Sequence, residues 1–202
     1  MKLGTNISFD VIKKVVKESD HPGPSAKGSY LPASVIALLS FDKEPTLMFI
    51  KKAEDKRYAW SGQMAFPGGH TDPEDNNRQE TALRELKEEM GINQGNVELL
   101  GSIGHFSTIN NREIETFIGV WNQKEDIVFD ESEISRVIPI SLNYLVSLHL
   151  EKGFNKERPD IFSLTYPFED VVIWGVTAKM IFHLIELLLP EIKNPMEKIH
   201  EI

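Results

Sequence analysis

The chain has 202 residues, of which 41% are hydrophobic and 26% charged, proportions that are ordinary for a soluble globular protein with its own core. Its formal net charge is -9, from 31 acidic and 22 basic side chains. A protein that binds nucleic acid through phosphate contacts usually has the opposite balance. The sequence contains no cysteine, which excludes disulfides, thiolate metal sites and cysteine nucleophiles.

Location and partners follow from the same features. No apolar run is long enough to span a bilayer, and residues 1–10 lack the basic-then-apolar order of a signal peptide. We therefore expect a single cytoplasmic domain over residues 1–202, with no nucleic-acid or membrane partner. A homodimer is compatible with the sequence.

The first third of the chain predicts one helix and three strands. Residues 8–19 form a short amphipathic helix, and a loop rich in proline and glycine follows over 20–32. Two apolar runs, 35–41 and 46–52, flank a polar turn and predict a β-hairpin. A short strand is expected at 64–66, directly before the glycine pair Gly68-Gly69.

The rest of the chain is dominated by a helix predicted over 78–90, with Gly91 where a C-terminal cap belongs. Further predictions are strands at 97–105 and 114–121, a short helix near 142–148 and a polar loop over 152–167. A last helix is predicted over 171–189. Because strands and helices mix without a regular alternation, we predict the α+β class, with a mixed sheet flanked by helices.

Three carboxylates share one side of the central helix. Glu85 lies three and four residues before Glu88 and Glu89, so the side chains project together and repel one another. A hard divalent cation such as magnesium reverses that repulsion, because it prefers oxygen ligands and keeps substrate phosphates in its shell. No histidine cluster with metal-ligand spacing accompanies them.

The residues around the three glutamates also fit a site for metal or phosphate. Arg84 is placed to hold a carboxylate through two hydrogen bonds and so to set the helix against its loop. Gly68 and Gly69 lack a Cβ, so their backbone can pass close to metal or phosphate. Asp72-Pro73 predicts a turn that returns the chain to the start of the helix.

In this arrangement the sequence resembles the Nudix box, G-x5-E-x7-R-E-U-x-E-E-x-G-U with U aliphatic. Its second half matches without a gap at Arg84, Glu85, Leu86, Glu88, Glu89, Gly91 and Ile92. The first half departs, because Gly69 lies fifteen residues before Arg84 instead of fourteen and Asn76 stands where the box has glutamate. Asp75 is the nearest acid that can replace it.

The longer loop is similar to that of the coenzyme A pyrophosphatase branch of the family. That branch has an upstream motif, L-L-T-x-R-[SA]-x3-R-x3-G-x3-F-P-G-G, to which Lys52-Ala53, Arg57 and Gly62 correspond with one extra residue before Gly62. Residues 173–178 near the C-terminus also resemble this branch, and the likeness spans roughly residues 32–182.

The resemblance implies a fold, a cofactor and site residues. The fold is the α/β/α sandwich of the family, and the cofactor is Mg²⁺ or Mn²⁺, held by Glu85, Glu88, Glu89 and Gly68. The implied catalytic residues are Arg84, Glu85, Glu88 and Glu89. The implied substrate-binding residues are Lys52, Arg57, Gly68 and Gly69, with Lys52 and Arg57 assigned to the 3′-phosphate of coenzyme A. The base that activates water varies in the family, and Glu113 and Glu115 are candidates alongside the box glutamates.

The implied reaction is metal-dependent hydrolysis of the pyrophosphate bond of coenzyme A or acyl-CoA, yielding 3′,5′-ADP and 4′-phosphopantetheine. One alternative is a Nudix pyrophosphatase that acts on ADP-ribose, a dinucleotide or a nucleoside triphosphate. A second is a non-catalytic domain that only binds a nucleotide. The three intact glutamates disfavour this second alternative.

Overall fold

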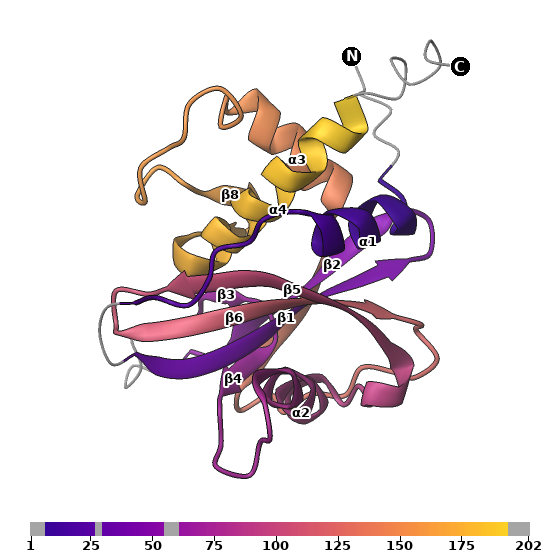
Figure 1. Ribbon diagram of the computed structural model, residues 1–202. Coiled ribbons are helices and arrows are strands. Elements are labelled where there is room, and N and C mark those ends of the chain that lie inside the picture. Colours follow the sequence, from indigo (N-terminus) through magenta and orange to yellow (C-terminus); the bar gives the residue numbers. More distant parts are fainter. Residues whose placement is uncertain (1–6, 27–29, 55–60, 194–202) are drawn as a thin grey trace.

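The computed structural model describes residues 7–26, 30–54 and 61–193. Figure 1 shows a twisted sheet with helix α2 on one face and helices α1, α3 and α4 on the other. The described helices, including one short 3₁₀ helix, are α1 Phe9–Glu18, α2 Arg78–Met90, η1 Gln94–Asn96, α3 Leu142–Glu151 and α4 Gly175–Lys193. The described strands are β1 Leu31–Phe41, β2 Pro45–Lys52, β3 Met64–Ala65, β4 Gly68–His70, β5 Val97–Ser107, β6 Arg112–Trp121, β7 Ile134–Ser141, β8 Tyr166–Phe168 and β9 Val171–Ile173.

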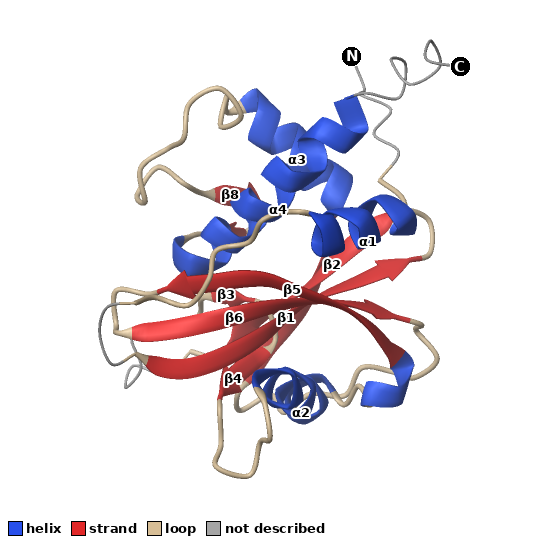
Figure 2. Ribbon diagram, in the orientation of Figure 1, coloured by secondary structure: helices blue, strands red, loops and turns tan. Residues whose placement is uncertain are grey.

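The main sheet is mixed. Its strands follow the order β3-β2-β1-β6-β5, with β4 paired to β1 and β7 paired to β2. Strands β1 and β2 are antiparallel, which confirms the predicted hairpin, whereas β1 and β6 run parallel. Together with the helices on both faces (Figure 2), this confirms the α+β class and the mixed sheet flanked by helices.

Each face of the sheet packs against its own apolar layer. Along β1, Ile36 and Leu38 belong to the cluster that packs on α2, and Ala37 and Leu39 belong to the cluster on the other face. Strand β1 is therefore buried on both sides, which explains why its sequence is a continuous apolar run instead of an alternating one. Because β1 is central in the sheet, one of its faces packs directly against α2.

Helix α2 has the predicted boundaries, residues 78–90. The Asn77 side chain accepts a hydrogen bond from the Glu80 amide at its start (3.0 Å). At its end Gly91 adopts a left-handed conformation with φ 70° and donates to the Lys87 carbonyl (2.9 Å). Among its core residues, Leu86 and Met90 are fully buried against the sheet. This packing holds the helix in one orientation relative to β4.

Two features differ from the predictions. The helix predicted to begin at residue 171 begins at Gly175, so that prediction was wrong: Val171–Ile173 forms β9, which pairs with β8 in a two-stranded sheet. Strands β4 and β7 were not predicted, because a three-residue glycine-containing strand and a strand with polar outward positions carry little apolar periodicity. None of the helices within the described ranges has the length and apolarity needed to cross a membrane.

The cap at Gly91 gives a stability prediction. A Cβ at Gly91 would meet the Val128 carbonyl at 3.0 Å, and the left-handed conformation itself costs a side chain about 1–2 kcal/mol. Gly91→Ala is therefore expected to lower the free energy of unfolding by at least that amount in urea denaturation. The control is Gly95→Ala, where a Cβ meets nothing within 4 Å. Equal losses in the two variants would contradict this account of the cap.

Candidate active site

The site begins where β4 passes under α2. Strand β4 pairs with the start of β1, with Gly68 opposite Val35 and Gly69 opposite Ser34. A Cβ on Gly68, whose φ is 150°, would overlap the Ser34 backbone, and a Cβ on Gly69 would overlap the Glu85 carboxylate. The two glycines therefore allow the carboxylate helix to approach the strand closely.

Glu89 is the most enclosed of the three glutamates, with a side chain only 3% exposed. Its Oε2 accepts a hydrogen bond from the Gly68 amide (2.8 Å), and its Oε1 is paired with the Lys52 ammonium. Burial raises the pKa of the Glu89 carboxyl, against the opposing effects of Lys52 and the Gly68 amide. Its carboxylate is thus fixed at the junction of α2, β2 and β4.

Glu85 and Glu88 share the guanidinium of Arg84. Nη1 of Arg84 lies 3.0 Å from Glu85 Oε1 and 3.0 Å from Glu88 Oε2. Burial raises the pKa of the Glu85 carboxyl, Arg84 lowers it, and the charges of Glu89 and Glu88 raise it further. Glu88 is the open member of the cluster, because its side chain is 58% exposed.

Arg84 holds a carboxylate through two hydrogen bonds, as predicted, and that carboxylate is Asp75. Nε and Nη2 of Arg84 lie 3.0 and 2.9 Å from the two oxygens of Asp75, and Nη2 also donates to the His70 carbonyl (2.9 Å). The Thr81 hydroxyl (2.8 Å) and the Asp72 amide (2.9 Å) complete the shell of Asp75. Hydrogen bonding to Arg84 holds the pKa of Asp75 well below its usual range. Asp75 thus supplies the partner that the longer loop lacks at position 76.

The donor set fits a hard divalent cation, but it is not already gathered around one point. No group of three or more His, Asp or Glu side chains within the described ranges is arranged as a metal site. The physical reason is that Arg84 holds Glu85 and Glu88, whereas Lys52 holds Glu89. Glu85 and Glu89 are enclosed and have raised carboxyl pKa values, and Glu88 is exposed. Carboxylates are nevertheless ligands of the type that magnesium or manganese takes.

The structure differs from the sequence analysis at Lys52. The sequence assigned Lys52 and Arg57 to the 3′-phosphate of coenzyme A, and the structure places the Lys52 ammonium on Glu89, inside the carboxylate cluster. Arg57 lies outside the described residues. Strand pairing explains the difference, because β2 crosses the sheet next to β1 and ends beside α2 at Lys52.

The two later acids have different surroundings. Glu113 is 7% exposed and is already engaged by the Ser25 amide (2.6 Å) and by Arg78 Nη2 (3.2 Å). The Glu115 carboxylate oxygens lie farther from their neighbours, 4.0 Å from Arg78 Nε and 3.9 Å from His105 Nε2. Of these two acids, Glu115 therefore has the less engaged carboxylate.

Sheet register brings Glu115 to the glycine pair. Ser34 of β1 lies between Gly69 on one side and Glu115 on the other. The Ser34 hydroxyl is fully buried and has no hydrogen-bond partner among the described residues, and buried hydroxyls of this kind commonly pair with a bound polar group. The buried Ser34 hydroxyl thus lies between the glycine pair and Glu115.

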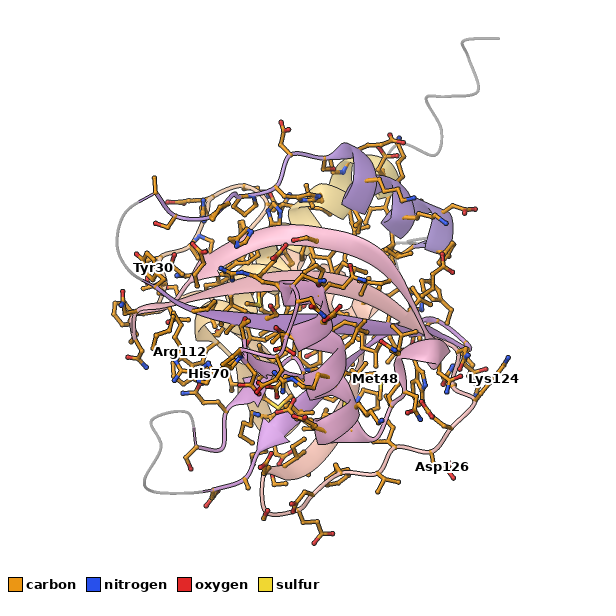
Figure 3. The ribbon with its side chains drawn as sticks, turned by 60° about the horizontal axis from the view of Figure 1, so that its bottom comes forward. Tyr30, Met48, His70, Arg112, Lys124 and Asp126 are labelled. Atoms are coloured by element: carbon orange, nitrogen blue, oxygen red, sulfur yellow. The ribbon has the colours of Figure 1, made fainter. Side chains whose placement is uncertain are left out.

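Two residues at the rim carried no sequence signal. His70, the last residue of β4, and Arg112, the first of β6, lie together (Figure 3), with Arg112 Nη1 3.1 Å from His70 Nδ1. Burial and the Arg112 charge lower the pKa of His70. The two residues are 42 apart in the sequence, so only the strand arrangement reveals a basic group at this end of the site.

The Arg84–Asp75 pair gives a prediction of pH-dependent stability. A carboxyl whose pKa is lowered in the folded state stabilises the protein above its unfolded pKa, near 4, and this contribution disappears as pH falls through the lower folded pKa. Asp75→Asn is expected to lose about 1.5–3 kcal/mol of unfolding free energy at pH 7. The difference from wild type should shrink below about pH 4.

Thermal or urea unfolding at several pH values would measure that difference. Glu74→Gln is the matched control, because Glu74 is exposed on the same loop, and it should change stability by less than about 0.5 kcal/mol. A loss for Asp75→Asn that stays constant down to pH 2 would refute the ion pair as its source.

Comparisons with known proteins agree with this geometry. A family model described as the NUDIX domain matches residues 30–164. The protein named "Uncharacterized Nudix hydrolase NudL" from Yersinia pestis (strain Pestoides F) is 30% identical over 154 residues, which cover 75% of this chain and 77% of that protein. NudL of Yersinia pseudotuberculosis serotype O:1b (strain IP 31758) has the same identity and coverage.

Among solved structures, the MutT/nudix family protein from Enterococcus faecalis covers 91% of this chain and 75% of its own, with a TM-score of 0.51. At 16% sequence identity this likeness shows the fold alone. The family match includes the glycine pair, Asp75 and the glutamates of α2, which the structure brings together. The chain belongs to the Nudix hydrolase family and is a pyrophosphohydrolase for nucleoside diphosphate derivatives.

Proposed function

We propose that this enzyme hydrolyses the pyrophosphate bond of coenzyme A or acyl-CoA, with Mg²⁺ or Mn²⁺ as its cofactor. The observation that carries the hydrolytic part is the enclosed carboxylate cluster of α2, set against the Gly68-Gly69 backbone. Glu85, Glu88, Glu89 and the Gly68 backbone would hold the cation. The bound cation would neutralise charge on the diphosphate and help to ionise a water.

The protein's own residues supply position and charge. The Gly68 amide and the packing of α2 hold Glu89, and Arg84 orients Glu85 and Glu88 from the side of the loop. Once the glutamates are drawn together around the cation, groups held in this way are effective because they need not move far during the reaction. Glu115 is our candidate for the group that orients water and accepts its proton, since Glu113 is engaged elsewhere.

We assign Lys52 to the diphosphate instead of the 3′-phosphate, because its ammonium lies on Glu89. An ammonium there can contact a phosphate oxygen as a point charge. His70 and Arg112 at the rim are the described basic residues that we assign to outer phosphate groups of the substrate.

The choice of coenzyme A rests on the family branch that the sequence resembles. This branch is distinguished by the longer loop, and in the structure that loop supplies Asp75 as the partner of Arg84. In the upstream motif Lys52-Ala53 replaces R-[SA], Arg57 matches the second arginine, and Gly62 matches the glycine with one extra residue before it. The alternative substrates are ADP-ribose, dinucleotides and nucleoside triphosphates, and a substrate assay distinguishes them from coenzyme A.

Two variants test the carboxylate cluster. Glu89→Gln keeps the size of the side chain but removes its charge, and Gly69→Ala places a methyl group where the Glu85 carboxylate lies. Each should lower kcat by about a hundredfold or more, equivalent to about 2.7 kcal/mol of transition-state stabilisation.

Because the group displaced in Gly69→Ala is the end of a flexible side chain, this variant should keep its melting temperature within a few degrees. Gly95→Ala, which meets nothing, is the control for the added methyl group. Near-normal kcat in both site variants would show that the catalytic cluster lies elsewhere.

A substrate panel tests specificity. Coenzyme A, dephospho-coenzyme A, ADP-ribose, NADH and diadenosine polyphosphates would be assayed with Mg²⁺ or Mn²⁺, and the products identified by mass. We expect the highest kcat/KM for coenzyme A, release of 3′,5′-ADP and 4′-phosphopantetheine, and loss of activity in chelator. A higher kcat/KM for ADP-ribose than for coenzyme A would replace the proposed substrate, and full activity after metal removal would contradict the reaction.

A further inference from the structure

A cavity of about 400 Å³ lies away from the carboxylate cluster. It is bounded by the middle of α4, the end of β5, Pro22 of the N-terminal loop, and Arg158 and Leu164 of the segment before β8. Helix α4 and α2 cover opposite faces of the sheet (Figure 1), so the sheet separates the α4 side of this cavity from the glutamates of α2. Its volume is within the range of sites for small molecules.

One part of the cavity is apolar and aromatic. Phe106 of β5 and Phe182 of α4 line it, together with Leu164. The His183 ring meets Phe106 edge-on, with ring centroids 5.7 Å apart. Burial lowers the pKa of His183 to about 4, so the ring is neutral near pH 7. These flat rings provide a surface for a planar apolar group.

Two cations line the same cavity without a carboxylate partner. Among the described residues, neither Arg158 nor Lys179 has an acidic oxygen within the 4.0 Å of a salt bridge. The Lys179 ammonium lies 3.5 Å from the Ser107 carbonyl, and the Arg158 guanidinium lies over the Phe182 ring at 5.7 Å. In a chain with a net charge of -9, two such cations at one cavity are unusual and favour an anion.

The Glu186 carboxylate also lines the cavity, but it is hydrogen-bonded to the buried His149. His149 is fully buried, with Nδ1 2.9 Å from the Tyr166 hydroxyl and Nε2 2.9 Å from Glu186. A carboxylate oxygen only accepts hydrogen bonds, so the proton in the contact with Glu186 is on His149 Nε2. His149 therefore donates from Nε2 to Glu186, which directs this carboxylate toward the buried histidine.

We propose that this cavity is a second binding site, for a small organic anion with a planar apolar body. Its carboxylate or phosphate group contacts Lys179 and Arg158, and its body lies against Phe106 and Phe182. Charge-assisted hydrogen bonds to the two cations provide most of the specificity, and the aromatic walls exclude anions that are too strongly hydrated. The site lies on the α4 side of the sheet, away from the glutamates of α2, although His105 both lines it and approaches Glu113 and Glu115 of β6. The proposal does not depend on the identity of the enzyme's substrate.

Titration of the full chain with phenyl phosphate and with benzoate tests this site. The measurement is isothermal calorimetry in chelator, so that metal at the carboxylate cluster does not contribute. We expect saturable binding of one equivalent by wild type. Lys179→Gln and Arg158→Gln should each weaken it about tenfold, as expected for one charge-assisted hydrogen bond.

Lys124→Gln is the matched control, because it removes one exposed cation remote from the cavity and should leave the affinity unchanged. The melting temperature of each variant reports whether it is folded. No saturable binding by folded wild type, or equal affinity in folded Lys179→Gln, would overturn the proposal.

Kinetics separate this site from the substrate site. Lys179→Gln should hydrolyse the best substrate of the panel with unchanged kcat and KM, and phenyl phosphate should not compete with that substrate. Competitive inhibition, with a raised KM in Lys179→Gln, would instead make the cavity part of the substrate site and overturn the proposal. Binding of phenyl phosphate by a Glu89→Gln variant that lacks activity would support the second site even if the proposed substrate is wrong.

Discussion

The pairing of Arg84 with Asp75 is the contact on which the site depends. One guanidinium binds the loop carboxylate, the His70 carbonyl at the end of β4, and the glutamates at positions 85 and 88. Helix, loop and strand are thereby held at one point. Because hydrogen bonds among charged groups are strong when partly enclosed, a loop one residue longer is accommodated without loosening the helix.

Charge balance explains how acidic groups can be enclosed in this place. Glu89 is almost fully buried, which would be costly for an isolated charge, but the Gly68 amide and the Lys52 ammonium satisfy its two oxygens. Arg84 donates to one oxygen of Glu85. The protein therefore maintains a negatively charged, partly dehydrated cluster, in which electrostatic interactions are stronger than in water.

The two faces of the sheet have different chemistry. The α2 face carries the enclosed glutamates, and the α4 face carries a cavity lined by Lys179, Arg158 and aromatic rings. Strand β5 connects the two, because His105 approaches the acids of β6 and also lines the cavity, and Phe106 lies in the core beneath α4.

The sequence by itself determined the helix over 78–90, its cap at Gly91, the hairpin and the bidentate role of Arg84, because these depend on local periodicity, capping and spacing. It could not determine that Lys52 pairs with Glu89, that Ser34 lies between Gly69 and Glu115, or that residues 171–173 form a strand. Those relations arise from strand register and from the packing of distant segments. Tertiary structure decided them because a strand's partner and the direction of its side chains are set by contacts far away in the chain.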